Sequence, residues 1–247
     1  MKFWLYILLP VSLLTACNKT PFTCEFSKER MTKQIDLQDF DTIEVNPLVQ
    51  LKIYDSTVNK MQITVSKDVW KNIDYKIVNR KLILTNHTDC LIENKEAVAF
   101  VDLYVDDIKC LIANTDMKIT SGNTWQFYQL DIICENNQIG TNNIADFEAD
   151  ININKLKIMA NGTSIFKMNG TSHDLFVGFY GGNPIFKGQN LLSQNIQVFQ
   201  RSDADMHLYP IQKITGNLYG YGDIYLYHRP PVIDITEHYA GHIYFVN

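Results

Sequence analysis

Several chemical signatures are missing from this sequence of 247 residues. It holds no GxSxG motif, no HExxH motif and no phosphate-binding glycine loop, and these absences argue against the common hydrolases and nucleotide-dependent enzymes. Its five cysteines form no CxxC pair, and its six histidines fall at different offsets within the repeat described below. A metal ion needs side chains that converge, so neither a metal site nor a cofactor is expected. The sequence therefore predicts a protein that is not an enzyme.

A surplus of basic residues is missing as well. The formal net charge is −5, and the 22 basic and 27 acidic residues are mixed along the chain. Because there is no basic tract to follow a phosphate backbone, a nucleic-acid partner is not expected. A hydrophobic content of 46% lies far from the composition of a disordered chain, so the protein has enough apolar side chains for a substantial core.

The N-terminus carries the features of a secretory signal. Lys2 precedes an almost entirely apolar segment, residues 3–14, which is too short to span a membrane. The Leu-Thr-Ala-Cys run that ends at Cys17 resembles a bacterial lipobox, in which the cysteine is lipidated and becomes the first mature residue. We therefore predict a signal peptide at residues 1–16, with the membrane as a partner through lipid on Cys17. An ordinary signal peptide followed by an incidental cysteine is the alternative.

Residues 17–34 are polar and are predicted to form a tether. The Asn-Lys-Thr-Pro sequence after Cys17 lacks an acidic cluster of the kind that resembles the surface-export signals of some bacterial lipoproteins. This favours the periplasmic side of the outer membrane. The other four cysteines allow three disulfide pairings, and buried free thiols are the alternative. They are Cys24, Cys90, Cys110 and Cys134.

A degenerate repeat dominates the second half of the chain. Apolar residues that start each unit recur every 18 to 26 residues at Leu111, Leu130, Leu156, Leu175, Ile196, Ile214 and Ile233. Such a period is typical of solenoids, in which one coil cannot bury its apolar face alone and neighbouring coils must stack. The 26-residue interval between Leu130 and Leu156 predicts an insertion, expected around residues 146–154.

The first half of the chain alternates apolar and polar residues in short runs, which indicates strands with one buried face. Two of these runs flank Asn79 and Arg80 and predict a hairpin. Sustained helical spacing is absent apart from weak patterns near residues 27–34 and 66–72. We therefore expect an all-β fold over residues 35–247, a right-handed β-solenoid preceded by a strand-rich N-terminal region.

The arrangement of glycine, aspartate and apolar positions resembles the auto-transporter adhesin, head GIN domain family over roughly residues 38–245. The resemblance is carried by the opening residues Phe40, Ile43 and Val45, the run Leu82-Ile83-Leu84, the turns Asn161-Gly162 and Gly181-Gly182-Asn183, and the endings Tyr219-Gly220-Tyr221-Gly222-Asp223-Ile224 and Gly241-His242-Ile243-Tyr244. The family is typical of lipoproteins and secreted proteins of Bacteroidetes-like bacteria. The resemblance implies a β-solenoid and indicates no ligand. Three turns depart from the pattern, at Asn136-Asn137, Ser202-Asp203 and His238-Tyr239.

One column of rings is the candidate binding surface. Directly after the later apolar residues of five units stand Phe166, Phe186, His207, Tyr225 and Tyr244. If those apolar residues point inward, alternation sends the rings outward as a ladder that rises about 4.8 Å per coil. Such a ladder would suit a sugar, a partner chain or a second copy of the protein. Lys167 and Lys187 favour the reverse orientation in two coils, with Phe166 and Phe186 in the core.

These features together predict a cell-envelope lipoprotein that acts as a non-catalytic binding, adhesion or structural module through one solenoid face. A glycan and an envelope protein are the candidate partners, and the oligomeric state is left open. The alternative is a carbohydrate-active enzyme of the β-helix type, favoured only by the cluster of Arg201, Asp203 and Asp205. Asp205 and Asp223 are expected to be turn residues rather than calcium ligands.

Overall fold

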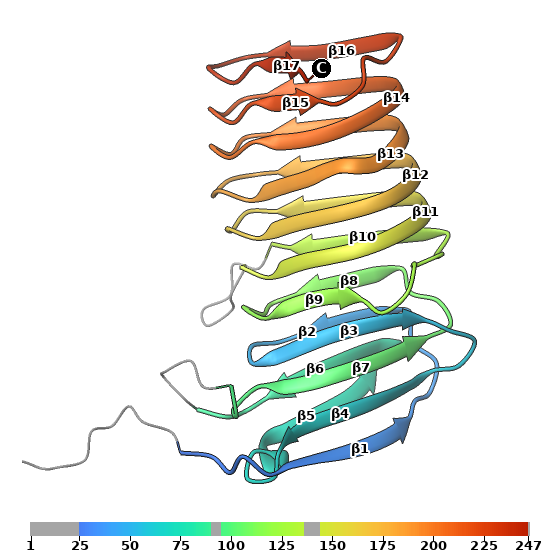
Figure 1. Ribbon diagram of the computed structural model, residues 1–247, viewed down its shortest axis with the longest axis vertical. Coiled ribbons are helices and arrows are strands. Elements are labelled where there is room, and N and C mark those ends of the chain that lie inside the picture. Colours follow the sequence, from blue (N-terminus) through green and yellow to red (C-terminus); the bar gives the residue numbers. More distant parts are fainter. Residues whose placement is uncertain (1–24, 90–94, 136–143, 247) are drawn as a thin grey trace, which may run out of the picture.

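The computed structural model describes residues 25–89, 95–135 and 144–246 (Figure 1). The predicted signal peptide and the lipidation residue Cys17 lie outside the described residues, as do Cys24 and Cys90. Strands make up 62% of the described part, and its one helical element is the 3₁₀ turn η1 (Trp70–Asn72). The all-β prediction is therefore confirmed.

All strands belong to one open, strongly curled sheet of 17 strands. In chain order they are β1 (Arg30–Asp36), β2 (Thr42–Val45), β3 (Val49–Asp55), β4 (Lys60–Ser66), β5 (Ile73–Val78), β6 (Lys81–Asn86), β7 (Ala99–Val105), β8 (Cys110–Ala113), β9 (Lys118–Ser121), β10 (Gln129–Cys134), β11 (Asp146–Ala160), β12 (Ile165–Phe179), β13 (Ile185–Gln200), β14 (Met206–Leu218), β15 (Ile224–Leu226), β16 (Val232–Glu237) and β17 (Ile243–Phe245).

Successive turns of the chain, here called passes, stack on one another along the long axis of the molecule (Figure 1). Strands β11 to β14 pair in parallel, each with the strand of the next pass, and the register shifts within the pairs β12–β13 and β13–β14. Their C-terminal halves continue one strip of strands, called strip A, which runs in the order β5, β6, β2, β8, β10, β11 to β14 and β16. Their N-terminal halves continue a second strip, called strip B, in the order β1, β4, β7, β3, β9, β11 to β14, β15 and β17.

The register along strip A follows the sequence repeat. Leu156 pairs with Leu130 on one side and with Leu175 on the other, and the pairing continues through Ile196 and Ile214 to the next pass. The predicted start at Leu111 differs, because Leu111 pairs with Ile132 and not with Leu130. A slip of two residues keeps the same side chains in the core, so the apolar pattern alone does not distinguish the two registers.

The insertion predicted at residues 146–154 is wrong. Those residues are strand in β11 and pair with β12, and residues 146–148 also pair with β9. The additional length lies earlier, in the connection 135–145 between β10 and β11, of which residues 136–143 are outside the described part. Polar and apolar residues alternate at 146–154, as a half-buried strand requires. The polar residues there indicate a strand with one exposed face and not an inserted loop.

The N-terminal region is strand-rich, as expected. β5 and β6 form the predicted antiparallel hairpin, and both residues of its turn adopt positive φ, 51° at Asn79 and 62° at Arg80. β1 starts at Arg30, inside the segment expected to be a tether, and pairs antiparallel with β4. The weak helical pattern at residues 66–72 contains only the three-residue turn η1.

Apolar residues that alternate along each strand meet in one core between the two strips. In β11, for example, Phe147 and Ile151 from strip B and Ile158 from strip A are at most 1% exposed. The two cysteines within the described residues are free thiols. Cys110 is half-buried, while burial raises the pKa of Cys134 to about 12, which keeps that thiol protonated and unreactive.

Candidate functional site

Two members of the predicted surface column lie in the core. Phe166 and Phe186 are 0% exposed, so the ladder of five outward rings is wrong. Phe166 packs between Phe147 and Phe179, with ring centroids 4.9 and 6.0 Å apart. The reverse orientation, which the two lysines after these rings favoured, is the one observed.

The outward ladder assigned these two side chains to the wrong face of the sheet, because the in–out alternation was placed one residue out of step. Phe166 and Phe186 pair in register with Met206, whereas Lys167 and Lys187 pair in register with His207. In β12 and β13 an isoleucine directly precedes the phenylalanine, so two adjacent apolar residues compete for one inward position. The lysines decide the outcome, because a charged side chain is costly to bury.

The other three members of the column face outward. His207 and Tyr225 are half-buried and Tyr244 is 45% exposed. The rings stack along the sheet, with centroids 5.1 Å apart between His207 and Tyr225 and 5.5 Å apart between Tyr225 and Tyr244. Burial lowers the pKa of His207, which keeps its ring neutral near pH 7. Since Tyr225 is stacked on both sides, this middle ring presents mainly its edge to a ligand.

A second stack runs along strip A, at the C-terminal ends of its strands. It comprises Tyr180, Phe199, Tyr219 and His238, with centroid separations of 5.0, 5.4 and 4.2 Å. The rings of Tyr219 and His238 are nearly parallel, at 7°. Here too the ring faces are occupied by neighbouring passes.

The aspartates of the C-terminal turns accept hydrogen bonds from the backbone. Asp205 accepts a hydrogen bond from the backbone N–H of Asp223 at 2.9 Å, and Asp223 accepts one from the N–H of His242 at 2.8 Å. Each carboxylate thus joins its own turn to the turn of the next pass. Among the described residues, no three histidine, cysteine or acidic side chains gather where they could hold a metal ion.

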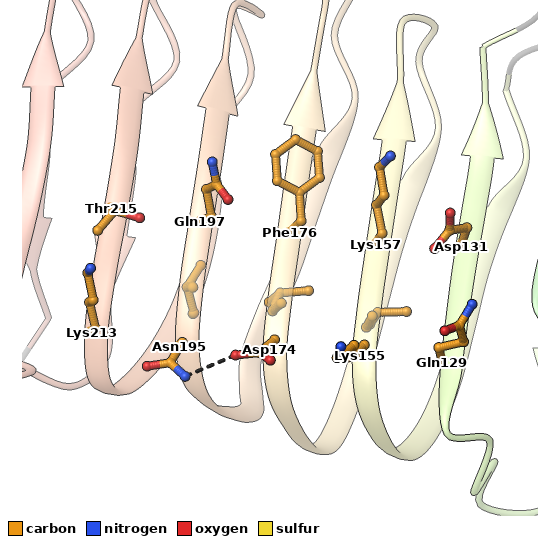
Figure 2. Close-up of a pocket in the computed structure, with 13 residues that line it drawn as sticks. Gln129, Asp131, Lys155, Lys157, Asp174, Phe176, Asn195, Gln197, Lys213 and Thr215 are labelled. Carbon is orange, nitrogen blue, oxygen red and sulfur yellow. Dashed lines mark hydrogen bonds between the residues drawn. The ribbon is translucent and has the colours of Figure 1, made fainter.

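A groove with a volume of about 540 Å³ crosses strip A from β10 to β14 (Figure 2). Two rows of outward side chains line it together with Leu156, Leu175 and Ile196, which lie between the rows in the sequence. Within each row, neighbours are partners across adjacent strands. The first row is Asp131, Lys157, Phe176, Gln197 and Thr215, and the second row is Gln129, Lys155, Asp174, Asn195 and Lys213. A hollow of this size is in the range of small-ligand sites.

Polar contacts hold the second row in place. The side-chain amide of Asn195 donates to Oδ1 of Asp174 at 2.9 Å (Figure 2), and Nδ1 of His173 lies 3.1 Å from the same oxygen. The hydrogen bond from Asn195 is the main reason that the pKa of Asp174 lies below its usual value. Asp174 is therefore an ionised hydrogen-bond acceptor, a state unsuited to a general acid.

The two carboxylates of the groove do not form a pair. Asp131 stands on β10 in the first row and Asp174 on β12 in the second, and the lysines of β11 lie between them (Figure 2). A glycosidase-type site requires two carboxyl groups that face one bond from either side. The groove instead mixes cationic, anionic and amide side chains around a single ring, Phe176.

Comparison with known proteins agrees with this architecture. The model of the family described as "Putative auto-transporter adhesin, head GIN domain" matches residues 39–230. The chain belongs to this family. The comparison with curated proteins found no matching relative. In the described part of the chain, no helix is long and apolar enough to cross a membrane.

Solved structures share the head GIN fold at low sequence identity. The crystal structure of a putative adhesin from Bacteroides fragilis NCTC 9343 has a TM-score of 0.79 and 15% identity, and the match covers 89% of this chain and 98% of that one. A putative adhesin from Parabacteroides distasonis ATCC 8503 has a TM-score of 0.63 at 12% identity, with 88% and 97% covered. A putative lipid binding protein from the same strain has a TM-score of 0.62 at 11% identity, with 90% and 98% covered.

Sequence reasoning did not single out the groove. The signal that was present is the repeat itself, because correct alignment of the core residues on strip A places the outward residues of β10 to β14 in the same two rows. Phe176 is the one aromatic residue in these rows. What alternation does not encode is the curvature of the sheet, which turns two rows of side chains into a hollow.

Proposed function

We propose that this chain is a cell-envelope lipoprotein, anchored through Cys17, whose β body is a non-catalytic binding module with its ligand site in the groove of strip A. Membership of an adhesin family supports a binding role. The observation that carries the proposal is the groove itself, in which side chains from five strands line one hollow without a facing pair of carboxylates. The middle ring of the stack on strip B, by contrast, offers a ligand mainly its edge.

The proposed fold of the module is a right-handed β-solenoid. Parallel pairing between successive passes supports a solenoid. Right-handed winding is the sense that connections between parallel strands strongly prefer, because twisted strands pack back onto their sheet in that sense. Strands β11 to β14 each cross from strip B to strip A without interruption, which gives a short and stiff connection between the strips.

The chemistry of the groove favours a polar ligand over a lipid chain. Its rows contain charged or amide side chains at eight positions, one hydroxyl at Thr215 and one ring at Phe176. Burying a lipid tail against these groups would leave ionised and amide side chains without hydrogen-bond partners, which is costly. One relative is described as a lipid binding protein, and that description applies to the relative.

The proposal is tested by filling the groove. The full chain, purified in detergent and immobilised, is exposed to a detergent extract of bacterial envelopes, and the retained material is quantified. Gln197→Trp places a bulky side chain next to Phe176 in the first row and should reduce retention at least about tenfold, the loss expected when a central contact is blocked.

Thr236→Trp is the matched control. Thr236 is an exposed strand residue of strip A on β16, outside the groove lining, so its replacement adds the same indole without blocking the site. Its retention should equal that of the wild type. Equal retention by the wild type and Gln197→Trp, or equal loss in both variants, would remove the groove as the binding site.

A further inference from the structure

The ring of Phe176 lies flat over its own strand. Figure 2 shows the ring face-on above β12, in the middle of the first row of the groove. The space for this pose comes from Gly178, two residues further along the same face. A Cβ at position 178 would come within 2.7 Å of Cε1 and 3.0 Å of Cζ of the Phe176 ring, so any side chain there would force the ring to move.

The outer face of this ring is not covered by another ring. In register, Phe176 lies between Lys157 and Gln197, and the ammonium group of Lys157 is 5.8 Å from the ring centroid. This distinguishes it from the aromatic residues of the two stacks, whose faces meet a neighbouring ring. Phe176 therefore turns its outer face to the groove, where the ammonium group of Lys157 lies over it.

Planar hydrogen-bonding groups surround that face. Asp174 and Asn195 belong to the second row, and Gln197 and Thr215 continue the first row beyond the ring. Carboxylate and amide groups both bind hydroxyl groups well, since a carboxylate only accepts hydrogen bonds and an amide both donates and accepts. A ring face with such groups around it fits a molecule that has one apolar C–H face and a rim of hydroxyl groups.

We propose that the ligand of the groove is a carbohydrate, with one sugar ring stacked on Phe176 and its hydroxyl groups bound by Asp174, Asn195 and Gln197. This inference rests on the proposed function and names the ligand class of the same site. A protein partner fits less well, because the centre of a protein interface is depleted in charged residues, whereas charged or amide side chains occupy eight of the 13 lining positions of this groove.

The length and charge of the groove narrow the ligand further. Five strands spaced about 4.8 Å apart give a floor roughly 19 Å long, so an oligosaccharide fills it better than a monosaccharide. Three lysines and two aspartates line the groove. Within the described residues, none of these lysines is within 4.0 Å of a carboxylate oxygen. Lys157 lies over Phe176, so Lys155 and Lys213 are the cations that can bind carboxylate or sulfate groups on a sugar chain.

The test uses defined oligosaccharides. The full chain in detergent is titrated by calorimetry with cello-, malto- and chito-oligosaccharides as neutral probes and with oligogalacturonate and heparin fragments as acidic probes. At least one probe should bind, and Phe176→Ala should weaken it at least about tenfold, the loss expected when a central aromatic contact is removed. Phe176→Tyr keeps the ring and should bind as the wild type does.

Two further variants, Gly178→Ala and Phe199→Ala, test whether affinity depends on the position of the Phe176 ring or on the stability of the strip. Gly178→Ala displaces the ring without removing it and should also weaken binding. Phe199→Ala deletes a ring on the same strip outside the groove and should leave affinity unchanged. If no probe binds, or if affinity is the same in the wild type and Phe176→Ala at equal thermal stability, the carbohydrate assignment is wrong.

The envelope extract distinguishes failure of this inference from failure of the proposed function. Periodate oxidation of the extract destroys sugar diols and should abolish the retention that Gln197→Trp blocks, while protease treatment should leave it intact. Groove-dependent retention that survives periodate and is lost after protease would overturn the carbohydrate ligand and leave the binding module standing. Retention that does not depend on the groove would overturn both.

Discussion

At the scale of single residues, alternation decides which side chain is core and which is surface. Phe166 lies in the core of strip B, and Tyr225 lies on its outer side, although each directly follows an isoleucine in the sequence. Replacing Phe166 with Ala removes a ring that is 0% exposed and stacked on Phe147. We expect a loss of about 3–5 kcal/mol in the free energy of unfolding, measured by denaturant titration.

The double variant Tyr225→Ala/Tyr244→Ala provides the comparison. Both rings face outward, and Tyr244 is 45% exposed, so each replacement should change stability by less than about 0.5 kcal/mol. A double variant that is destabilised as much as Phe166→Ala would show that these rings support the core. A Phe166→Ala protein as stable as the wild type would contradict the packing of strip B.

The sequence could predict part of this pattern. Alternation with clear partners, as around Tyr225, gave the correct side, and charged neighbours indicated it at Phe166 and Phe186. A run of two apolar residues satisfies either orientation, because the free energy of burying an isoleucine is close to that of burying a phenylalanine. The flat pose of Phe176 was out of reach, since it depends on how close a glycine lies to a ring.

At the scale of strands, ion pairs join passes on the outer side of strip B. Glu148 on β11 binds Lys118 on β9 at 2.6 Å and Lys167 on β12 at 2.9 Å. Hydrogen bonds from these two lysines lower the pKa of Glu148 from 4.5 to about 2. Because the folded-state pKa is the lower one, the stabilisation is present above about pH 4.5 and is lost as the pH falls toward 2.

Glu148→Gln tests this network. The side chain of Glu148 is 42% exposed, so solvent screening should limit the difference in unfolding free energy to less than about 1 kcal/mol at pH 7. The difference between wild type and variant should shrink between pH 4.5 and 2, and it should also shrink in high salt. A difference that stays constant over this pH range would mean that Glu148 acts through packing and not through charge.

Strand order was more predictable than strand boundaries. The repeat gave the register from Leu130 to Ile233 on strip A, because each coil must place its apolar residues over those of the previous coil. Leu111 and the insertion were misplaced, since both depend on connections whose length the repeat does not restrict. The hairpin at Asn79 and Arg80 followed from local turn chemistry.

At the scale of the whole molecule, the two ends of the stack differ. The N-terminal end is closed by β1 and β5, which are antiparallel to their neighbours and rich in charged residues. At the other end β16 and β17 form the last pass, with Ile233 37% and Phe245 40% exposed. Strip A runs along the length of the stack (Figure 1). Its groove is lined by β10 to β14 and therefore lies between the two ends. The proposed anchor at Cys17 precedes β1 in the sequence, whereas the groove is built from β10 to β14.

The anchor is the last feature that a single substitution can test. Cys17→Ser removes the thiol that accepts the lipid through a thioether, so we expect the protein to leave the membrane fraction or to remain unprocessed. Cys24→Ser is the matched control, because it removes a nearby cysteine and should leave fractionation unchanged. On the periplasmic side of the outer membrane, the body should resist external protease in intact cells and become sensitive once that membrane is opened. Normal processing and membrane fractionation of Cys17→Ser would contradict the lipoprotein, and digestion in intact cells would place the body on the cell surface.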